Sequence, residues 1–353
     1  MRSKPRWWQP LVHAGRRPLL VKRAAITAAT RQWFSEQDFI EVETAALQRS
    51  PGIEPHLHPF ATDWRDIGGK PSQRFLHTSP EFAMKKLLVA GESRIFQLAK
   101  VWRNREDSPL HSPEFTMLEW YRAPRHGEGA IDWQVLIADC AALIALAARV
   151  AGCAEFRLRR LSCDPFAPIR QMTVAEAFEQ FAGIDILATA PEPLVPDFGL
   201  LARAAERVGI AAHDGDDWES LYFRIMFDKI EPFLGQDAPL ALTHYPLSMA
   251  ALARPSRDDP RTAERVEVYC AGVELANGFA ELGDAVEQRR RFELDQKRKY
   301  ELYGEWVPID EDLLAALEFG LPDCCGIALG FDRLVMLATG AELLEQVIWS
   351  LVE

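Results

Sequence analysis

An arginine followed by an alternating run of aromatic and acidic residues stands out between residues 101 and 121. Arg103 precedes a turn-forming patch, and Phe115, Glu119 and Tyr121 then occupy alternate positions. Two strands joined by a polar loop produce this pattern, and alternate side chains of a strand share one face. A carboxylate on such a face must be paired or must serve a ligand. A cationic ligand with an apolar stem fits, because the carboxylate takes its charge and the rings take its methylenes.

A second polar stretch, residues 265–282, has the same alternation around a tight turn. Glu267 and Glu274 flank the turn, and opposed carboxylates on a hairpin could share a hard cation such as the magnesium that accompanies ATP. Beyond the turn an amide, a ring and a carboxylate alternate and are expected to face one way, namely Asn277, Phe279 and Glu281.

Composition restricts the class of protein. The 353 residues are 48% hydrophobic, which is enough for a sizeable core. A net charge of −12 argues against non-specific nucleic-acid binding, because phosphate contacts need clustered Lys and Arg. The six cysteines form no C-x-x-C pair, which favours a reduced compartment, here the cytoplasm. The most apolar segment, 135–150, is shorter than the roughly 20 residues that span a bilayer, so no membrane association is expected.

The elements that must position these residues can be read from periodicity. Residues 1–18 form an N-terminal tail, too short for a separate domain before residue 19. Residues 48–70 are expected to be a loop, and about 127–240 an insertion. Helices are expected at 21–37, 82–90, 131–151, 174–181, 218–230, 286–303 and 310–319, and strands at 39–44 and 240–245.

Three ordered stretches carry a family resemblance. The helix and strand over 21–44 resemble motif 1 of the class II aminoacyl-tRNA synthetases, 101–121 resembles motif 2, and 322–336 resembles motif 3. H-S-P-E-F-T-M-L-E-W-Y looks like the lysyl-tRNA synthetase version of motif 2. The resemblance implies an α+β fold, a mostly antiparallel sheet flanked by helices over 19–353, and a homodimer that uses ATP and Mg²⁺.

The resemblance also implies residue roles. Arg103 would bridge the α-phosphate and the substrate carboxylate, and Arg333 would bind the ATP tail; these two are the expected catalytic residues. Glu267 and Glu274 would hold the metal. The expected ATP-binding residues are Arg103, Asn104, Arg105, Glu106, His111, Phe115, Glu274, Leu275, Gly330 and Arg333. The expected amino-acid-binding residues are Ser79, Pro80, Glu81, Glu119, Tyr121, Asn277, Phe279, Glu281 and Ala328.

The chain departs from the synthetase pattern at several positions. Arg105 replaces the Glu that accepts a hydrogen bond from adenine, so Glu106 takes that role after a loop shift, or backbone carbonyls suffice, or nucleotide affinity is weakened. Ala45 replaces a Pro in motif 1, Ala328 replaces a Gly, and the segment after Pro246 lacks a second Pro. The extra methyl of Ala328 should change which amino acid fits. An anticodon-binding domain is also not expected.

These departures resemble the elongation factor P lysine ligases, truncated paralogues of lysyl-tRNA synthetase. The resemblance implies that lysine or (R)-β-lysine is activated by ATP as an aminoacyl-adenylate and transferred to a lysine side chain of elongation factor P. In this case tRNA is not the expected partner. Two alternatives remain open: a free-standing lysine-activating enzyme that charges tRNA or a carrier protein, and a non-catalytic amino-acid-binding paralogue.

Overall fold

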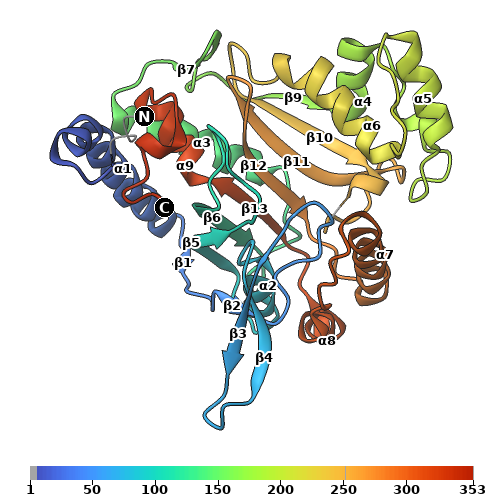
Figure 1. Cartoon of the computed structure of the whole chain (residues 1–353), viewed down its shortest axis with the longest axis horizontal. Helices are drawn as coiled ribbons and strands as arrows, with labels where there is room; N and C mark the ends of the chain where they lie inside the picture. Colours follow the sequence, from blue (N-terminus) through green and yellow to red (C-terminus); the bar gives the residue numbers. More distant parts are fainter. Residues whose placement is uncertain (1–5, 251, 353) are drawn as a thin grey trace.

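A computed structural model describes residues 6–250 and 252–352 and is built around one large sheet (Figure 1). The strand order is β1-β5-β6-β13-β12-β11-β10-β9, with parallel pairing at β1–β5 and β9–β10 and antiparallel pairing between. Within the described residues its strands are β1 (Ile40–Glu41), β5 (Arg94–Trp102), β6 (Glu114–Arg122), β9 (Arg170–Thr173), β10 (Leu240–Pro246), β11 (Thr262–Cys270), β12 (Val273–Ala280) and β13 (Cys325–Gly330).

Helices cover one face of the sheet and leave part of the other face open. The α1, α3 and α9 helices pack with sheet residues such as Leu118 and Trp120 in the main core. None of the helices in the described residues is both long and apolar enough to cross a membrane. The α-helices of the described part are α1 (Pro10–Glu36), α2 (Glu81–Val89), α3 (Val135–Ala151), α4 (Val174–Ala177), α5 (Phe198–Arg207), α6 (Trp218–Ile225), α7 (Ala285–Tyr303), α8 (Glu311–Gly320) and α9 (Phe331–Thr339).

The mixed helices and mostly antiparallel sheet confirm the predicted α+β class. The predicted hairpin over 101–121 is β5–β6, in register from Arg94↔Arg122 to Trp102↔Glu114. The hairpin over 265–282 is β11–β12. On β6 the alternation is explained by burial on both faces: Leu118 and Trp120 enter the helix-covered core, while Glu119 turns to the opposite face.

Three predicted elements have wrong bounds, and one of them is the helix predicted over 131–151, which begins at Val135. The first helix begins at Pro10 rather than residue 21, so residues 10–18 of the predicted 1–18 tail are helical. Pro10 is tolerated in the first turn because the N–H group that proline lacks would have no partner within the helix there. Pro18 lies inside this helix, although a proline in the interior usually kinks or ends a helix. The predicted strand over 39–44 shortens to Ile40–Glu41.

The predicted loop over 48–70 contains a strand. A small sheet in the order β2-β4-β3 is formed by β2 (Leu47–Gln48), β3 (Phe60–Arg65) and β4 (Pro71–Leu76). The β3–β4 hairpin projects from the body of the protein (Figure 1). Nearly all β3 residues are exposed, so the strand lacks the apolar alternation that reveals a half-buried strand in a sequence.

The segment between motifs 2 and 3 divides into two parts. The α3 helix and the short β7–β8 hairpin (Phe156–Leu158 and Leu161–Cys163) join the main core. From Val174 onward the chain forms a separate hydrophobic cluster of α4, α5 and α6 against β10. The predicted helices over 174–181 and 218–230 are present, each as an α-helical start that continues as a π-helix, Phe178–Ala182 and Met226–Ile230.

Candidate active site

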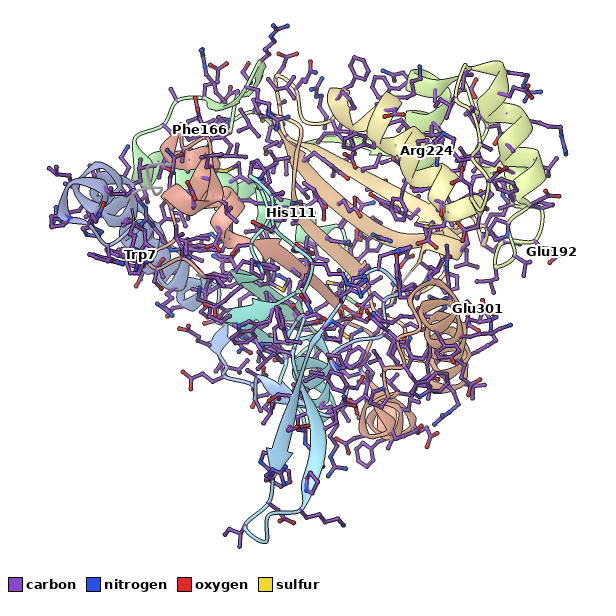
Figure 2. All side chains as sticks on the ribbon, in the orientation of Figure 1. Trp7, His111, Phe166, Glu192, Arg224 and Glu301 are labelled. Atoms are coloured by element: carbon purple, nitrogen blue, oxygen red, sulfur yellow. The ribbon has the colours of Figure 1, made fainter. Side chains whose placement is uncertain are left out.

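A cavity of about 900 Å³ lies over the open face of the sheet, between β6, β11, β12 and β13 below and α6 and α7 at its side. His111 lies near the middle of this face and Glu301 of α7 at its edge (Figure 2). The cavity brings together most of the predicted site residues, namely Ser79, Glu81, Arg103, Glu106, His111, Phe115, Glu267, Glu274, Leu275, Asn277, Phe279, Ala328, Gly330 and Arg333.

Strand register places one row of chemistry-bearing side chains across four strands. Glu119 of β6 pairs with Ala328 of β13, which pairs with Asn277 of β12, which pairs with Glu267 of β11. Residues opposite one another on neighbouring strands point to the same face. The side chains predicted separately from motif 2, motif 3 and the second hairpin therefore form one continuous floor.

A neighbouring row forms the deeper part of the floor. Tyr121 pairs with Gly326, which pairs with Phe279, which pairs with Arg265. A Cβ on Gly326 would come within 2.2 Å of the Tyr121 ring, so only glycine fits there. Arg265 is a site residue that sequence reasoning missed. Its guanidinium lies 4.4 Å from the centroid of the Tyr245 ring and donates to Glu267 at 2.7 Å.

Three glutamates and one lysine form the acidic end of the site. Lys85 Nζ, which is buried, lies 2.6 Å from Glu81 and 2.6 Å from Glu281. Glu119 accepts hydrogen bonds from Ser79 and Tyr121, each at 2.7 Å. With all three carboxylates ionised, the cluster carries two uncompensated negative charges, which a diamino acid could neutralise.

Burial opposes that ionisation. It raises the pKa of Glu119 to about 8, with a further contribution from Glu81, and it raises the pKa of Glu281 to about 7. Glu119, Tyr121 and Glu281 lie beneath the cavity wall rather than on it, while Ser79 and Glu81 reach the cavity. Lys85 was not predicted as a site residue, although its i,i+4 spacing from Glu81 on α2 was a signal for pairing.

Two arginines lie at the end of the site that is predicted to bind the nucleotide. The Arg103 guanidinium carbon lies 5.2 Å from the centroid of the Phe115 ring, and its Nε is buried with no hydrogen-bond partner among the described residues. Arg333 Nη2 lies 2.7 Å from His111 Nε2, and its Nη1 donates to the Glu274 carbonyl at 2.9 Å. The Arg333 side chain of motif 3 thus connects motif 2 with β12. Burial and Arg333 lower the pKa of His111.

Comparisons agree with this arrangement. A family model described as class II tRNA synthetases (D, K and N) matches residues 1–349. The chain belongs to this family. The protein named Elongation factor P--(R)-beta-lysine ligase in Haemophilus influenzae (strain PittGG) is 39% identical over 346 residues, 97% of this chain and 96% of the relative. The protein of the same name in Pectobacterium carotovorum subsp. carotovorum (strain PC1) is 40% identical over 349 residues, 98% of both chains.

Class II synthetases use ATP, and the two predicted metal ligands fit a shared magnesium only in part. The Glu267 carboxylate already accepts hydrogen bonds from Arg265 at 2.7 Å and from the Tyr269 hydroxyl at 2.6 Å. Glu274 is more open, with Arg333 4.0 Å away as its ion-pair partner. No group of three or more His, Cys, Asp or Glu in the described residues could hold a metal. Mg²⁺ would therefore rest on Glu274, with Glu267 beside it, and would take its remaining oxygens from phosphates and water.

Besides the buried Glu119, Tyr121 and Glu281, three predicted residues of this synthetase site do not line the cavity: Pro80, Asn104 and Arg105. Arg105 has a positive φ of 64° and pairs outward with Glu305 at 2.6 Å, while Glu305 also lies 2.9 Å from His58. Glu106 lines the cavity instead. Of the three possibilities left by the sequence, this placement favours Glu106 as the acceptor for adenine.

The Arg105–Glu305 pair should support nucleotide binding by holding this loop. Arg105→Ala should raise the KM for ATP about two- to fivefold, because partly exposed ion pairs contribute up to about 1 kcal/mol, and should barely change the melting temperature. Steady-state kinetics at varied ATP concentration would measure the KM for ATP. The charge-swapped double variant Arg105→Glu/Glu305→Arg should restore the KM for ATP. An unchanged KM in Arg105→Ala would show that the Arg105–Glu305 ion pair does not support nucleotide binding.

Proposed function

We propose that this protein is a ligase that activates lysine or (R)-β-lysine with ATP and transfers it to a lysine side chain of elongation factor P. The observation that carries the donor class is the buried Glu81–Lys85–Glu281 cluster beside Glu119, because it needs added positive charge. The acceptor follows from relatives of this name that match nearly the whole chain at about 40% identity.

The first step joins the donor carboxylate to ATP. A carboxylate oxygen of the donor attacks the α-phosphorus, and pyrophosphate leaves with the electrons of the broken P–O bond. Negative charge builds on the oxygens around that phosphorus, and the Arg103 guanidinium stabilises it. Arg333, held by His111, binds the outer phosphates. When bound, Mg²⁺ supplies charge neutralisation on the phosphates. In the second step an amine of the acceptor attacks the acyl carbon and AMP leaves.

Three finer expectations belong to the same proposal. The protein forms a homodimer through α1 and β1, acts in the cytoplasm, and does not use tRNA as acceptor. The support for the last point is the net charge of −12, which disfavours phosphate contacts. The roles given to individual site residues are likewise predictions.

Mass spectrometry would test the function. Elongation factor P incubated with the protein, ATP and either lysine isomer should gain the mass of one lysyl group on one lysine. ATP–pyrophosphate exchange, measured alongside, should depend on the donor. Exchange with aminoacylation of tRNA or a carrier protein, but none of elongation factor P, would favour the free-standing enzyme. Donor binding without exchange would favour the non-catalytic paralogue.

Ala328 should set donor preference. It lies in the floor row between Glu119 and Asn277 and lines the cavity. Ala328→Gly removes one methyl and deepens the pocket, which should shift the ratio of kcat/KM values for α-lysine and (R)-β-lysine by about 10-fold, since one methylene in a pocket contributes about 1–3 kcal/mol. Donor competition in the exchange assay would measure the ratio, and an unchanged ratio would remove Ala328 from donor selection.

A further inference from the structure

The cavity extends beyond the donor site into a second compartment. We call it the α6–α7 wing and define it by Phe198, Trp218, Phe223, Leu294 and Asp295. Its walls carry both apolar and charged side chains, and Glu301, whose side chain is 61% exposed, lies at the edge of the molecule (Figure 2). The aromatic rings and Leu294 of the wing suit the methylenes of an incoming lysine side chain.

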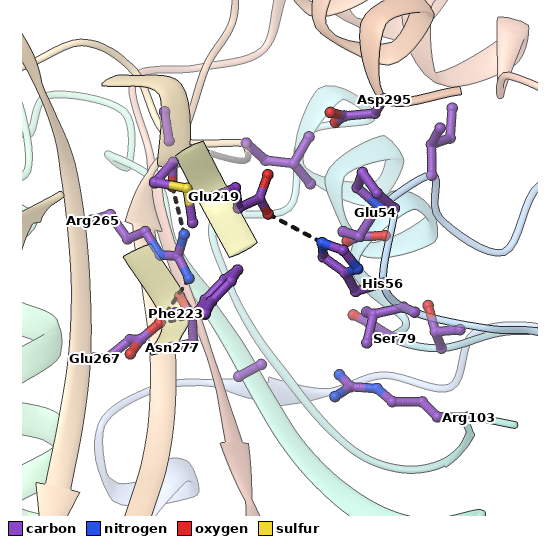
Figure 3. A pocket seen from close by; sticks show the side chains of 18 of the residues that line it. Glu54, His56, Ser79, Arg103, Glu219, Phe223, Arg265, Glu267, Asn277 and Asp295 are labelled. Atoms are coloured by element: carbon purple, nitrogen blue, oxygen red, sulfur yellow. Dashed lines mark hydrogen bonds and ion pairs between the residues drawn. The ribbon is translucent and has the colours of Figure 1, made fainter. Parts of the chain in front are cut away.

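Glu54 lies where this wing meets the donor site (Figure 3). Its Oε2 is buried and has no hydrogen-bond partner among the described residues. Lys299 of α7 donates a hydrogen bond to the Glu54 backbone carbonyl at 3.0 Å, and no ion pair between Lys299 and the Glu54 carboxylate is found in the described part of the chain. Gly52 leaves the room for that carboxylate, since a Cβ there would lie 2.7 Å from Oε2.

The charges around Glu54 come from both compartments. Glu81 and Arg103 act on it from the donor site, and Lys299 acts from α7. Burial, with Glu81 nearby, raises the pKa of Glu54. Burial also raises the pKa of Asp295, on the facing side of α7, to about 7, with Glu54 and Glu219 adding to the rise and Arg298 and Arg291 opposing it. Two carboxylates that resist ionisation would be relieved by a cation between them.

Donor binding leaves Glu54 unused. A diamino acid brings two ammonium groups, and Glu81, Glu119 and Glu281 already surround the donor end of the site. Glu54 is an additional buried carboxylate on the wing side. The proposed function needs a third amine, that of the acceptor, and this amine must lose protons before and during attack.

We propose that Glu54, with Asp295 across the wing, binds the ammonium of the acceptor lysine and accepts one of its protons during transfer. This inference rests on the proposed function. The acceptor nitrogen forms a C–N bond with the acyl carbon as the C–O bond to phosphate breaks, and AMP leaves with that electron pair. The nitrogen loses two protons in all, one to the Glu54 carboxylate and one to solvent.

Separate assays of the two half-reactions test this assignment. Glu54→Gln should lower the ratio of the single-turnover transfer rate to the exchange rate by about 100-fold, the order expected for a lost proton acceptor. Asp295→Asn should lower it about tenfold. Glu293→Gln, an exposed acid on the same helix, is the matched control and should leave the ratio unchanged. Glu54→Asp, which keeps the charge, should recover part of the transfer rate.

Stability gives an independent readout. Because Glu54 Oε2 is buried with no hydrogen-bond partner among the described residues, Glu54→Gln should keep or raise the melting temperature, whereas a structural carboxylate would lower it. A normal transfer rate in Glu54→Gln overturns the inference, and so does a defect confined to a higher KM for the donor in exchange. If wild-type protein catalysed ATP–pyrophosphate exchange but never modified elongation factor P, the proposed function itself would be overturned. That result differs from either outcome for Glu54→Gln.

Discussion

Arg103→Lys should lower ATP–pyrophosphate exchange by about 100- to 1000-fold, the loss seen when one preorganised donor is removed from a transition state. Arg103 lines the cavity directly after β5, and the ring of Phe115 holds its guanidinium carbon 5.2 Å from the ring centroid. Its buried Nε has no hydrogen-bond partner in the described part of the chain, which leaves that donor for a ligand. Lysine keeps the charge but loses the planar fork that can bridge two oxygens.

The matched control lies on the same strand. Arg94 begins β5 at the end away from the cavity and pairs with Glu128 at 3.2 Å. Arg94→Lys should therefore leave exchange within about twofold of wild type, since pairs of this kind contribute little. If Arg103→Lys lost no more activity than Arg94→Lys, the reacting phosphate would have to lie elsewhere in the cavity.

The sequence was most informative where alternation reports burial directly. The alternation of Glu119 and Tyr121 predicted that their side chains share one face of the sheet. The 2.7 Å hydrogen bond between the two side chains agrees with this prediction. The row from Glu119 to Glu267 could not be predicted from periodicity, because it depends on register between strands far apart in the chain. The family resemblance supplied this long-range information instead.

The missed residues share a physical reason. Lys85 looks like an ordinary helix lysine until β12 and its following turn bring Glu281 to within 2.6 Å of it. Glu54 lies in a stretch rich in proline and glycine, where an acidic residue is normally solvated. Lys299 of α7, more than 200 residues later, donates a hydrogen bond to its backbone carbonyl. Local sequence carries no record of such contacts.

The affinity for the donor should rise with pH between about 6 and 8. Glu281 has a pKa of about 7 and Glu119 a pKa of about 8, both raised first by burial. Below these values the carboxyls are protonated and neutral, and they ionise as pH rises, while the ammonium groups of the donor remain largely charged. The KM for lysine in the exchange assay should therefore fall across this range. Glu281→Gln should raise the KM at pH 8 by about 10- to 100-fold, the effect of losing a charged hydrogen-bond partner.

A substrate control separates charge recognition from general damage. Norleucine has the length of lysine without its terminal amine, so wild-type protein should discriminate strongly against it, and Glu281→Gln should lose most of that discrimination. The variant should stay folded because Lys85 keeps Glu81 at 2.6 Å as a partner. A KM for lysine that is flat from pH 6 to 8, together with unaltered rejection of norleucine in Glu281→Gln, would mean that the buried carboxylates do not bind the donor. The acidic cluster would then have to be explained by stability alone, with Lys85 bridging Glu81 of α2 and Glu281 after β12 without any ligand.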